Sequence, residues 1–276
     1  MGRSVRGVSS RWSDLDRPPL SASRLRRALV DGGTWRAVEV VERTESTNAD
    51  LAAAARRGEP AGLVLLAEEQ TSGRGRLNRR WEAPARACVL GSVLVRPVTP
   101  PSSWPLVALI AGVAVAEAVR SVASLPAVVK WPNDVLLSGR KVAGILAERV
   151  DDAIVVGIGI NVSVRTAELA GPAATSVALE GGVADRESLA KETFRALGRR
   201  LAGWADANGA PSAVLPAYRE ICDTIGRDVV VELPEGDSMP GLAQAVDDTG
   251  RLVVRRADGE TEALSVGDVV HVTAAG

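Results

Sequence analysis

The chain has 276 residues and a formal net charge of −1, with 46% hydrophobic and 24% charged residues. This length can bury one large core and leave room for one small additional domain. The balanced charge excludes a nucleic-acid binder with an overall basic surface, so any attraction for anions must be local. The two cysteines, Cys88 and Cys222, match neither a metal pattern nor a disulfide framework, which favours a cytoplasmic protein.

Residues 1–34 contain several arginines and Pro18-Pro19 but no long apolar run, so we expect neither a signal peptide nor a membrane span there. We expect this segment to be mostly disordered, with one short helix over 23–30. A winged helix-turn-helix DNA reader needs several such elements. The sequence therefore predicts no DNA-binding domain ahead of the globular pattern, which begins at Trp35.

A polar triplet marks the start of the first globular helix. Residues 37–41 predict a short strand, and 49–57 predict a helix. Ser46 or Thr47 is placed to cap that helix by accepting hydrogen bonds from its free backbone N–H groups. Capping alone explains the triplet that Asn48 completes, and the functional alternative is a polar small molecule held at the helix start.

Four arginines and two glycines crowd the segment 70–81, Gln-Thr-Ser-Gly-Arg-Gly-Arg-Leu-Asn-Arg-Arg-Trp, which contains no acid. If the segment is extended, Arg74 and Arg76 point to the same side, while Gly73 and Gly75 let the backbone approach a ligand. Paired guanidinium groups beside bare peptide N–H groups suit a phosphate or a carboxylate. A solvated basic loop is the structural alternative. A Walker loop and a dinucleotide fingerprint are excluded, because the Gly-Lys-Ser/Thr and the third glycine are missing.

Apolar runs at 63–67 and 88–95 predict strands on either side of this segment. A loop between two strands has anchored ends and a free middle, which is the arrangement of a lid. The next apolar run predicts a helix from Trp104-Pro105 to about Val119. This helix is too short to span a bilayer and carries Glu117, so we expect it to be buried under a sheet. Further strands are expected at 127–131, 135–137, 141–150 and 153–162.

Only three lysines occur in a chain otherwise stocked with arginine, and two of them, Lys130 and Lys141, flank the turn Trp131-Pro132-Asn133-Asp134. Lysine carries a compact ammonium charge, whereas arginine carries a planar guanidinium group. One explanation for the two lysines is therefore that the chemistry of the site requires an ammonium group. With so few lysines, chance is the other.

Helices over 187–204 and 212–219 precede a change of composition near Ile225. From there, short strands at close spacing predict a separate small β-barrel of about fifty residues. Its His271 is the only histidine of the chain, and we expect it to be structural. No histidine-based triad, nucleophile elbow or zinc spacing occurs.

A site rich in Arg, Lys, Asn and Gly is better suited to stabilising charge than to shuttling protons. Joining a carboxylate to a nucleotide phosphate is such a reaction, because two anions must be brought together and the developing charge neutralised. Five motifs follow one another along the chain: Ser46-Thr47-Asn48, Gly73-Arg74-Gly75-Arg76 with Trp81, Lys130-Trp131-Pro132-Asn133-Asp134, Arg140-Lys141-Val142-Ala143-Gly144-Ile145-Leu146 and Gly159-Ile160-Asn161. In their order and spacing these motifs resemble those of biotin protein ligases.

The resemblance covers the chain from about residue 36 to its end. It implies an α+β fold in which a mixed β-sheet flanked by helices, related to class II aminoacyl-tRNA synthetases, forms a catalytic domain over 35–224. An SH3-like barrel over 225–276 follows. It also implies that biotin and Mg-ATP give biotinyl-5′-adenylate and pyrophosphate, after which one lysine of a biotin carboxyl carrier domain of acyl-CoA carboxylases is acylated. Nucleic acid and membranes are not expected as partners, and a monomer or weak homodimer is expected.

The resemblance also assigns provisional roles to single residues. Lys141, expected to bridge the biotin carboxylate and the α-phosphate, and Arg76 are the catalytic candidates, and no metal ligand is assigned beyond the Mg²⁺ that accompanies ATP. Asp134 is either part of the site or a turn-forming residue. Biotin is assigned to Ser46, Thr47, Asn48, Gln70, Gly73, Arg74, Lys141 and Gly144. ATP and the adenylate are assigned to Arg74, Gly75, Arg76, Trp81, Lys130, Asn133 and Asn161.

Two departures from the family pattern stand out. Asn78 occupies the place of a third loop glycine, next to Leu77. Because asparagine tolerates left-handed backbone, we expect the loop to work, with its closing rate left open. The missing DNA-binding domain points to a ligase-only form.

Two rival functions remain. Lipoate ligases share the fold and the adenylation chemistry but resemble this chain poorly at the Arg/Gly loop. An RNA-binding module would need stacking aromatics, and the chain has one Phe, one Tyr and six Trp.

Overall fold

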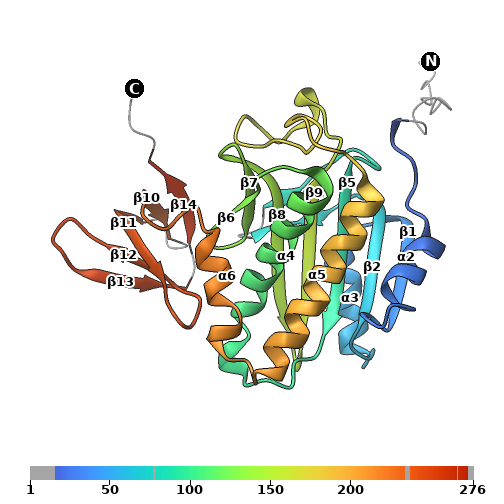
Figure 1. Ribbon diagram of the computed structural model, residues 1–276, viewed down its shortest axis with the longest axis horizontal. Helices are drawn as coiled ribbons and strands as arrows, with labels where there is room; N and C mark the ends of the chain where they lie inside the picture. Colours follow the sequence, from blue (N-terminus) through green and yellow to red (C-terminus); the bar gives the residue numbers. More distant parts are fainter. Residues whose placement is uncertain (1–15, 77–78, 234–236, 266, 273–276) are drawn as a thin grey trace, which may run out of the picture.

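The computed structural model describes residues 16–76, 79–233, 237–265 and 267–272, and the elements below lie within them (Figure 1). Two sequence expectations fall outside these residues: the disorder expected for residues 1–15, and the effect of Asn78 on the loop. The described chain forms a large sheet with helices on both faces and a small β domain beside it.

The large sheet is mixed, as the resemblance implied. Its first two strands are parallel, and every other neighbouring pair is antiparallel. In spatial order its seven strands are β1 (Ala37–Thr44), β2 (Leu63–Gln70), β5 (Cys88–Val95), β9 (Ala153–Asn161), β8 (Arg140–Val150), β7 (Asp134–Leu137) and β6 (Val128–Lys130).

One face of the sheet is covered by α4 (Leu106–Ala123) and α5 (Arg186–Asp206), with α6 (Leu215–Glu220) beside α4 (Figure 1). Helix α4 continues to Ala123 rather than ending near Val119, and its small and branched apolar side chains are buried around most of its circumference. The expectation that this helix is too short to span a bilayer is wrong, since by length and composition alone α4 could cross a membrane. Yet 72% of it is buried inside this fold. The expectation of a buried helix under a sheet is therefore confirmed.

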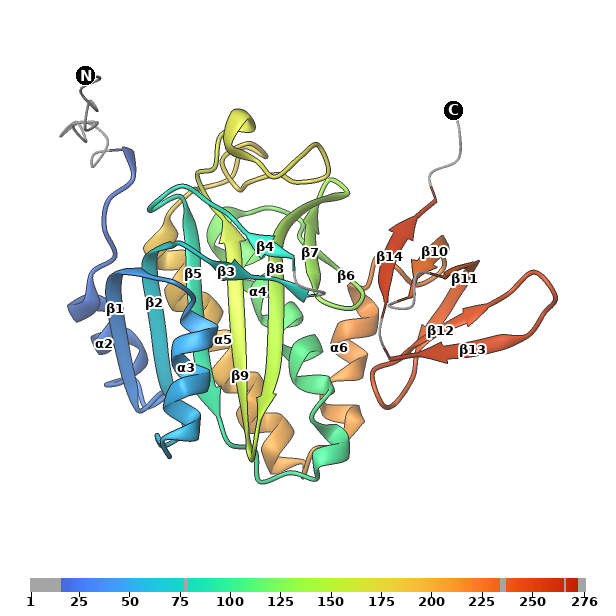
Figure 2. The ribbon, with the colours of Figure 1, turned by 180° about the vertical axis from the view of Figure 1, so that it is seen from behind.

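The opposite face carries α3 (Thr47–Arg56), which lies over β5 and β9 (Figure 2). Side chains alternate between the two faces along each strand. On β5, Val89 and Val93 join the large core under α4 and α5, whereas Leu90 and Ser92 point to the α3 face. The α3 face is thus partly polar, and it receives the short hairpin of β3 (Gly73–Arg74) and β4 (Arg80–Trp81).

The N-terminal helix α2 (Ala22–Leu29) agrees with the helix expected over 23–30. Ser21 caps it by accepting a hydrogen bond from the backbone N–H of Arg24. Its Leu25 and Leu29 are fully buried in the large core. This helix therefore packs as part of the same body as the large sheet.

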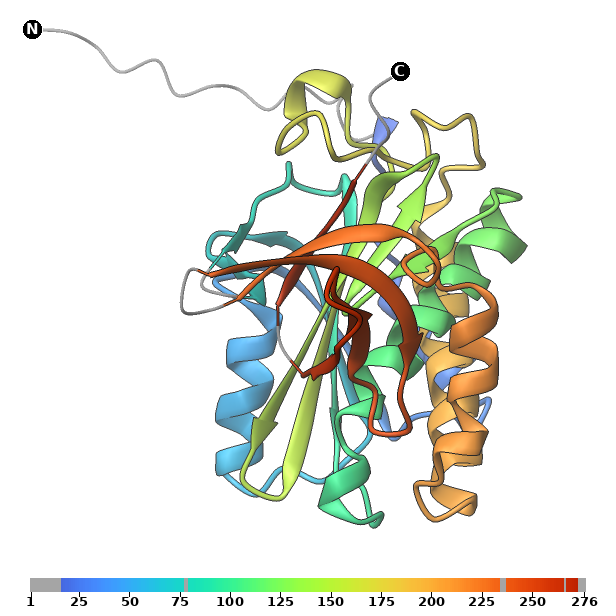
Figure 3. The same ribbon diagram turned by 90° about the vertical axis from the view of Figure 1, so that its left-hand side faces the viewer.

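The small domain is a five-stranded antiparallel sheet that faces the viewer in Figure 3. Its strands curve around a core that includes Val229, Val231 and Val254. The indole Nε1 of Trp131 donates to the carbonyl of Gly250 at 3.0 Å, which joins the two domains. The strands are β10 (Asp228–Glu232), β11 (Ser238–Val246), β12 (Leu252–Arg255), β13 (Thr261–Leu264) and β14 (Asp268–His271).

Candidate active site

A pocket with about 790 Å³ of empty space, part of it open to solvent, lies on the α3 face beneath the β3–β4 hairpin. Asp268 of the small domain also reaches its lining. Three predicted residues do not line this pocket: Gly73, which lines neither space, and Lys130 and Asn161, which line a second cavity beside it. The predicted residues that do line the pocket are Ser46, Thr47, Asn48, Gln70, Arg74, Gly75, Arg76, Trp81, Asn133, Lys141 and Gly144.

Two glycines of β9 make the floor of this pocket flat. A Cβ atom at Gly157 would lie 2.1 Å from Oδ1 of Asn48, and one at Gly159 would lie 2.7 Å from Cε2 of Trp81. Real side chains do not approach so closely, so only glycine lets Asn48 and Trp81 rest on the strand. The two glycines thus leave room for two side chains on the face of the strand.

The pocket has a polar end built from buried hydroxyl and amide groups. Oγ1 of Thr47 lies 2.7 Å from Oγ of Ser92, which donates to Oδ1 of Asn48 at 2.6 Å. The backbone N–H of Thr47 donates to Oε1 of Gln70 at 2.8 Å. Oγ1 of Thr47 also lies 3.0 Å from Oε1 of Gln70, which can only accept. Ser92 gives its proton to Asn48, so the single hydroxyl proton of Thr47 has two acceptors within reach, Ser92 and Gln70. The Gln70 NH₂ group then faces Gly73, where a Cβ would come within 3.0 Å of Nε2.

Ser46 and Asn48 both have structural partners. Oγ of Ser46 accepts from the backbone N–H of Ala49 at 3.4 Å, so Ser46 is the N-cap of α3. The amide nitrogen of Asn48 donates to Oε2 of Glu148 at 2.7 Å and to the carbonyl of Leu146 at 3.2 Å. Asn48 is therefore held in place from both sides, and it fixes α3 against the sheet.

The cationic end of the pocket begins beside Glu148, the carboxylate that also holds Asn48. Nη1 of Arg74 lies 3.9 Å from Oε1 of Glu148, and the Arg74 side chain is 56% exposed. Nη1 of Arg76 donates to Oδ1 of Asn133 at 3.2 Å and to the carbonyl of Gly267 at 3.4 Å. Partial burial lowers the pKa of Arg76, against the raising effect of nearby carboxylates, yet an arginine stays charged at neutral pH. The two guanidinium groups therefore bring positive charge to this end from the β3–β4 hairpin.

Lys141 completes this end. Its Nζ lies 2.7 Å from Oδ1 of Asp134 and 5.7 Å from the ring centroid of Trp81. Asp134 therefore lies in the site as the partner of Lys141, in addition to starting β7. The Nε1 atom of Trp81 is buried and has no hydrogen-bond partner among the described residues. A buried donor without an acceptor is costly, so this group is suited to a ligand atom.

The second cavity holds about 1130 Å³ of empty space, including space open to solvent, and shares Trp81, Asp134 and Lys141 with the first pocket. Burial lowers the pKa of Lys130, which has no ion pair among the described residues. Asn161 donates from Nδ2 to the carbonyl of Thr175 at 2.9 Å. Lys141 thus stands where two adjoining spaces meet.

Several residues of the site carried little or no signal in the sequence. Ser92 is the one hydroxyl in the apolar run of β5, and that contrast could have identified it. Glu148 had no such signal, and Arg79 stood out only as one of the four arginines of segment 70–81. Asp268, which forms an ion pair with Arg79, belongs to another domain and could be placed only by the fold.

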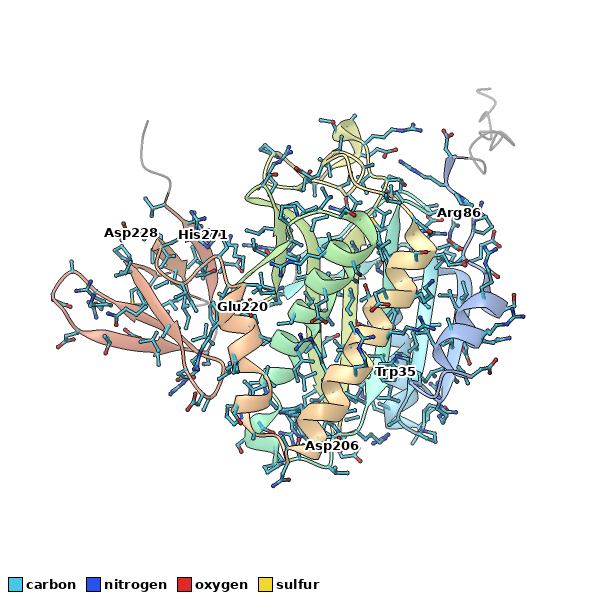
Figure 4. The ribbon with its side chains drawn as sticks, in the orientation of Figure 1. Trp35, Arg86, Asp206, Glu220, Asp228 and His271 are labelled. Carbon is cyan, nitrogen blue, oxygen red and sulfur yellow. The ribbon has the colours of Figure 1, made fainter. Side chains whose placement is uncertain are left out.

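His271 lies in the small domain, as Figure 4 shows, and lines neither cavity. Its Nε2 lies 3.1 Å from Oγ1 of Thr224, which in turn accepts from the backbone N–H of Trp131 at 3.0 Å. The structural role expected for His271 agrees with these contacts, because they join the small domain to the turn that carries Asn133.

Comparisons with known proteins agree with this geometry. The Biotin/lipoate A/B protein ligase family matches residues 40–164, and the Biotin protein ligase C terminal domain matches residues 224–272. The biotin--acetyl-CoA-carboxylase ligase of Mycobacterium tuberculosis is 45% identical over 267 residues, which cover 94% of this chain and 98% of that protein. The chain belongs to the biotin protein ligase family.

A second biotin--acetyl-CoA-carboxylase ligase, from Paracoccus denitrificans, is 32% identical over 78% of this chain and 93% of its own length. The biotin protein ligase of Aquifex aeolicus in complex with biotin and ATP has a TM-score of 0.73. It is 23% identical, and the match covers 86% of this chain and 99% of that one. The predicted biotin protein ligase fold, with its C-terminal β domain, is confirmed, and the RNA-binding alternative is set aside.

Proposed function

We propose that this biotin protein ligase uses ATP to convert biotin to biotinyl-5′-adenylate and then transfers the biotinyl group to a lysine of a biotin carboxyl carrier domain of an acyl-CoA carboxylase. One observation carries the proposal: Arg74, Arg76 and Lys141 line the same pocket as a buried, hydrogen-bonded network of hydroxyl and amide groups. A ligand with a neutral polar head and an anionic tail matches that combination.

The biotin end of the site follows from this combination. The ureido head is assigned to the end formed by Thr47 and Gln70. There the Gln70 NH₂ group is a donor, and the hydrogen bond from the backbone N–H of Thr47 to Oε1 of Gln70 holds it in place. Leu90 and the Trp81 ring supply apolar surface for the rest of the ligand. The carboxylate then lies toward Lys141 and Arg74, which is where its charge is stabilised.

The nucleotide is assigned to the second cavity, beside Lys130 and Asn161. Lys141 lines both spaces, so its ammonium group can neutralise the biotin carboxylate and the α-phosphate together. The orphaned Nε1 of Trp81 supports a ligand acceptor close by. Asp134 holds Lys141 between the two anions, which is a positioning role.

Magnesium enters with ATP and supplies neutralisation of the phosphates. The described residues contain no group of three or more His, Cys, Asp or Glu side chains able to hold a metal ion by themselves. We further propose a catalytic domain over 35–224, a small domain over 225–276, and a cytoplasmic monomer or weak homodimer that engages neither nucleic acid nor membrane.

Mass spectrometry of a purified carrier domain tests the proposal. After incubation with this protein, biotin and Mg-ATP, the carrier domain is expected to gain one biotinyl group, and a carrier domain whose acceptor lysine is replaced by arginine is expected to gain none. Lipoate in place of biotin is expected to leave the carrier unmodified. Transfer of lipoate without transfer of biotin would overturn the assignment of the polar end to biotin.

A further inference from the structure

Residues 16–20 form an N-terminal strap that precedes helix α2. Nη2 of Arg17 donates to the carbonyl of Ser163 at 2.9 Å and to Oε2 of Glu168 at 2.6 Å. The Arg17 side chain is only 13% exposed, although it lies in a segment that the sequence predicted to be mostly disordered. A buried guanidinium group that makes two hydrogen bonds holds the contacted residues, here Ser163 and Glu168, in place.

The other end of the strap is attached to a buried ion pair. Oε1 of Glu68 accepts from the backbone N–H of Leu20 at 2.6 Å, and Nη2 of Arg186 donates to the carbonyl of Pro18 at 2.9 Å. Glu68 and Arg186 themselves pair at 2.5 Å with side chains that are 7% and 6% exposed. Arg17 is therefore presented from a backbone that is anchored to the large sheet and to α5.

The segment that Arg17 contacts is a wall of the second cavity. Glu168, Leu169 and Ala170 line that cavity. At its far end the segment is tied to β8, because the backbone N–H of Lys141 donates to the carbonyl of Ala173 at 2.8 Å. At its near end, Arg17 provides the tie. The wall is thus held on one side by the strand of Lys141 and on the other by the strap.

The ionised state of Glu168 favours this contact. Partial burial opposes ionisation of its carboxyl group, but hydrogen bonds from Arg17 and from the backbone N–H of Arg165 outweigh it, so the pKa of Glu168 lies below its usual value. The carboxylate therefore stays charged at neutral pH and keeps its bond to the strap. The exposed pair of Asp16 with Arg165, at 3.4 Å, adds a second and weaker link.

We propose that Arg17 is a positioning residue for the nucleotide: by fixing residues 163–169, it preorganises the wall against which the nucleotide packs during adenylation. This inference rests on the proposed function, which places the nucleotide in the second cavity. Preorganisation of this kind lowers the cost of ordering the wall when the nucleotide binds. Biotin, assigned to the other pocket, does not contact this wall.

Steady-state kinetics of adenylate formation test the proposal with three variants. Arg17→Ala is expected to raise the KM for ATP about fivefold, the effect typical of losing one coupled contact. The dissociation constant for biotin alone, measured by calorimetry, is expected to stay within about twofold because the strap does not touch the biotin pocket. Arg17→Lys keeps the positive charge but loses the planar guanidinium group, so its KM for ATP is expected to lie between those of the wild type and Arg17→Ala. Arg24→Ala is the matched control, since it removes the 2.6 Å pair with Glu187 from helix α2, directly after the strap, without touching the wall.

A double-mutant cycle separates positioning from general loosening. If Arg17 acts through Glu168, Arg17→Ala in a Glu168→Gln background is expected to raise the KM for ATP less than it does in the wild-type background. An unchanged KM in Arg17→Ala, or an equal weakening of ATP and biotin, would overturn the inference. Leu169→Arg, which fills the second cavity, tests the underlying assignment. If it leaves the KM for ATP unchanged, the nucleotide placement fails; if it raises the KM while Arg17→Ala does not, only the role of Arg17 fails.

Discussion

At the polar end of the pocket, Thr47, Asn48 and Ser92 are at most 4% exposed and are joined by short hydrogen bonds. At the cationic end, the side chains of Arg74 and Lys141 are 56% and 36% exposed, and the closest carboxylate oxygen to Arg74 is 3.9 Å away. One end is packed like the core of the protein, and the other resembles its surface.

This difference follows from what each end must bind. A neutral polar head can be met by donors and acceptors that already satisfy one another, so the fold can build that end in advance. Cations are costly to bury, so the fold leaves Arg74 and Lys141 partly exposed beside Glu148 and Asp134 until the substrates supply further negative charge. Substitutions at the polar end should therefore lower the stability of the fold, whereas substitutions at the cationic end should slow the reaction.

The largest expected effect is on chemistry at the cationic end. Lys141→Ala should slow biotinyl-adenylate formation about a hundredfold or more, because a charge-stabilising group that faces both substrates is lost. Its free energy of unfolding should change by no more than about 1 kcal/mol, since the ion pair with Asp134 is partly exposed. Single-turnover kinetics and urea unfolding measure the two effects.

Lys191→Ala is the matched control, because Lys191 lies on α5 outside both cavities. It should leave the adenylation rate unchanged. A parental rate in Lys141→Ala would show that the lysine has no part in the reaction.

The next largest effect is on stability at the polar end. Ser92→Ala removes the hydroxyl between Thr47 and Asn48, which leaves buried polar atoms without partners and should cost about 1–3 kcal/mol of stability. Urea unfolding measures the loss. Ser121→Ala, on the exposed side of α4, is the control and should change stability by less than about 0.5 kcal/mol. Equal stabilities of the two variants would contradict a preformed polar end.

The sequence predicted the parts of this site that local rules govern. The strand over 88–95 has the predicted bounds, and Ser46 caps the helix as capping rules require. A glycine within a strand is visible in the sequence, but only the structure shows that Asn48 and Trp81 are the side chains that approach Gly157 and Gly159.

The remaining parts of the site depend on contacts between residues that are far apart in the sequence. Glu148 joins Asn48 across 100 positions of sequence, and Asp268 meets Arg79 from another domain. Arg17 is one of many arginines in a segment of low apolar content, and only its burial against Ser163 and Glu168 reveals its role. Local propensity carries no information about such contacts.

The smallest expected effect concerns pH. Burial lowers the pKa of His271 below 6.5, with neighbouring Lys130 acting in the same direction. As the pH falls through 6.5, the unfolded chain therefore takes up the proton before the folded chain does, and stability is lost below that pH. Urea unfolding at pH 7 and pH 5 should show a smaller loss in His271→Gln than in the parent, because glutamine does not titrate. An identical loss in both would remove His271 as a source of the pH dependence.

A crystal structure with biotin and a non-hydrolysable ATP analogue tests the central claim most directly. The account predicts Nζ of Lys141 within hydrogen-bonding distance of both the carboxylate and the α-phosphate, with Arg74 and Arg76 turned from Glu148 and Asn133 toward the two anions. A structure in which both ligands are bound while these three side chains keep their present partners and touch neither anion would contradict it.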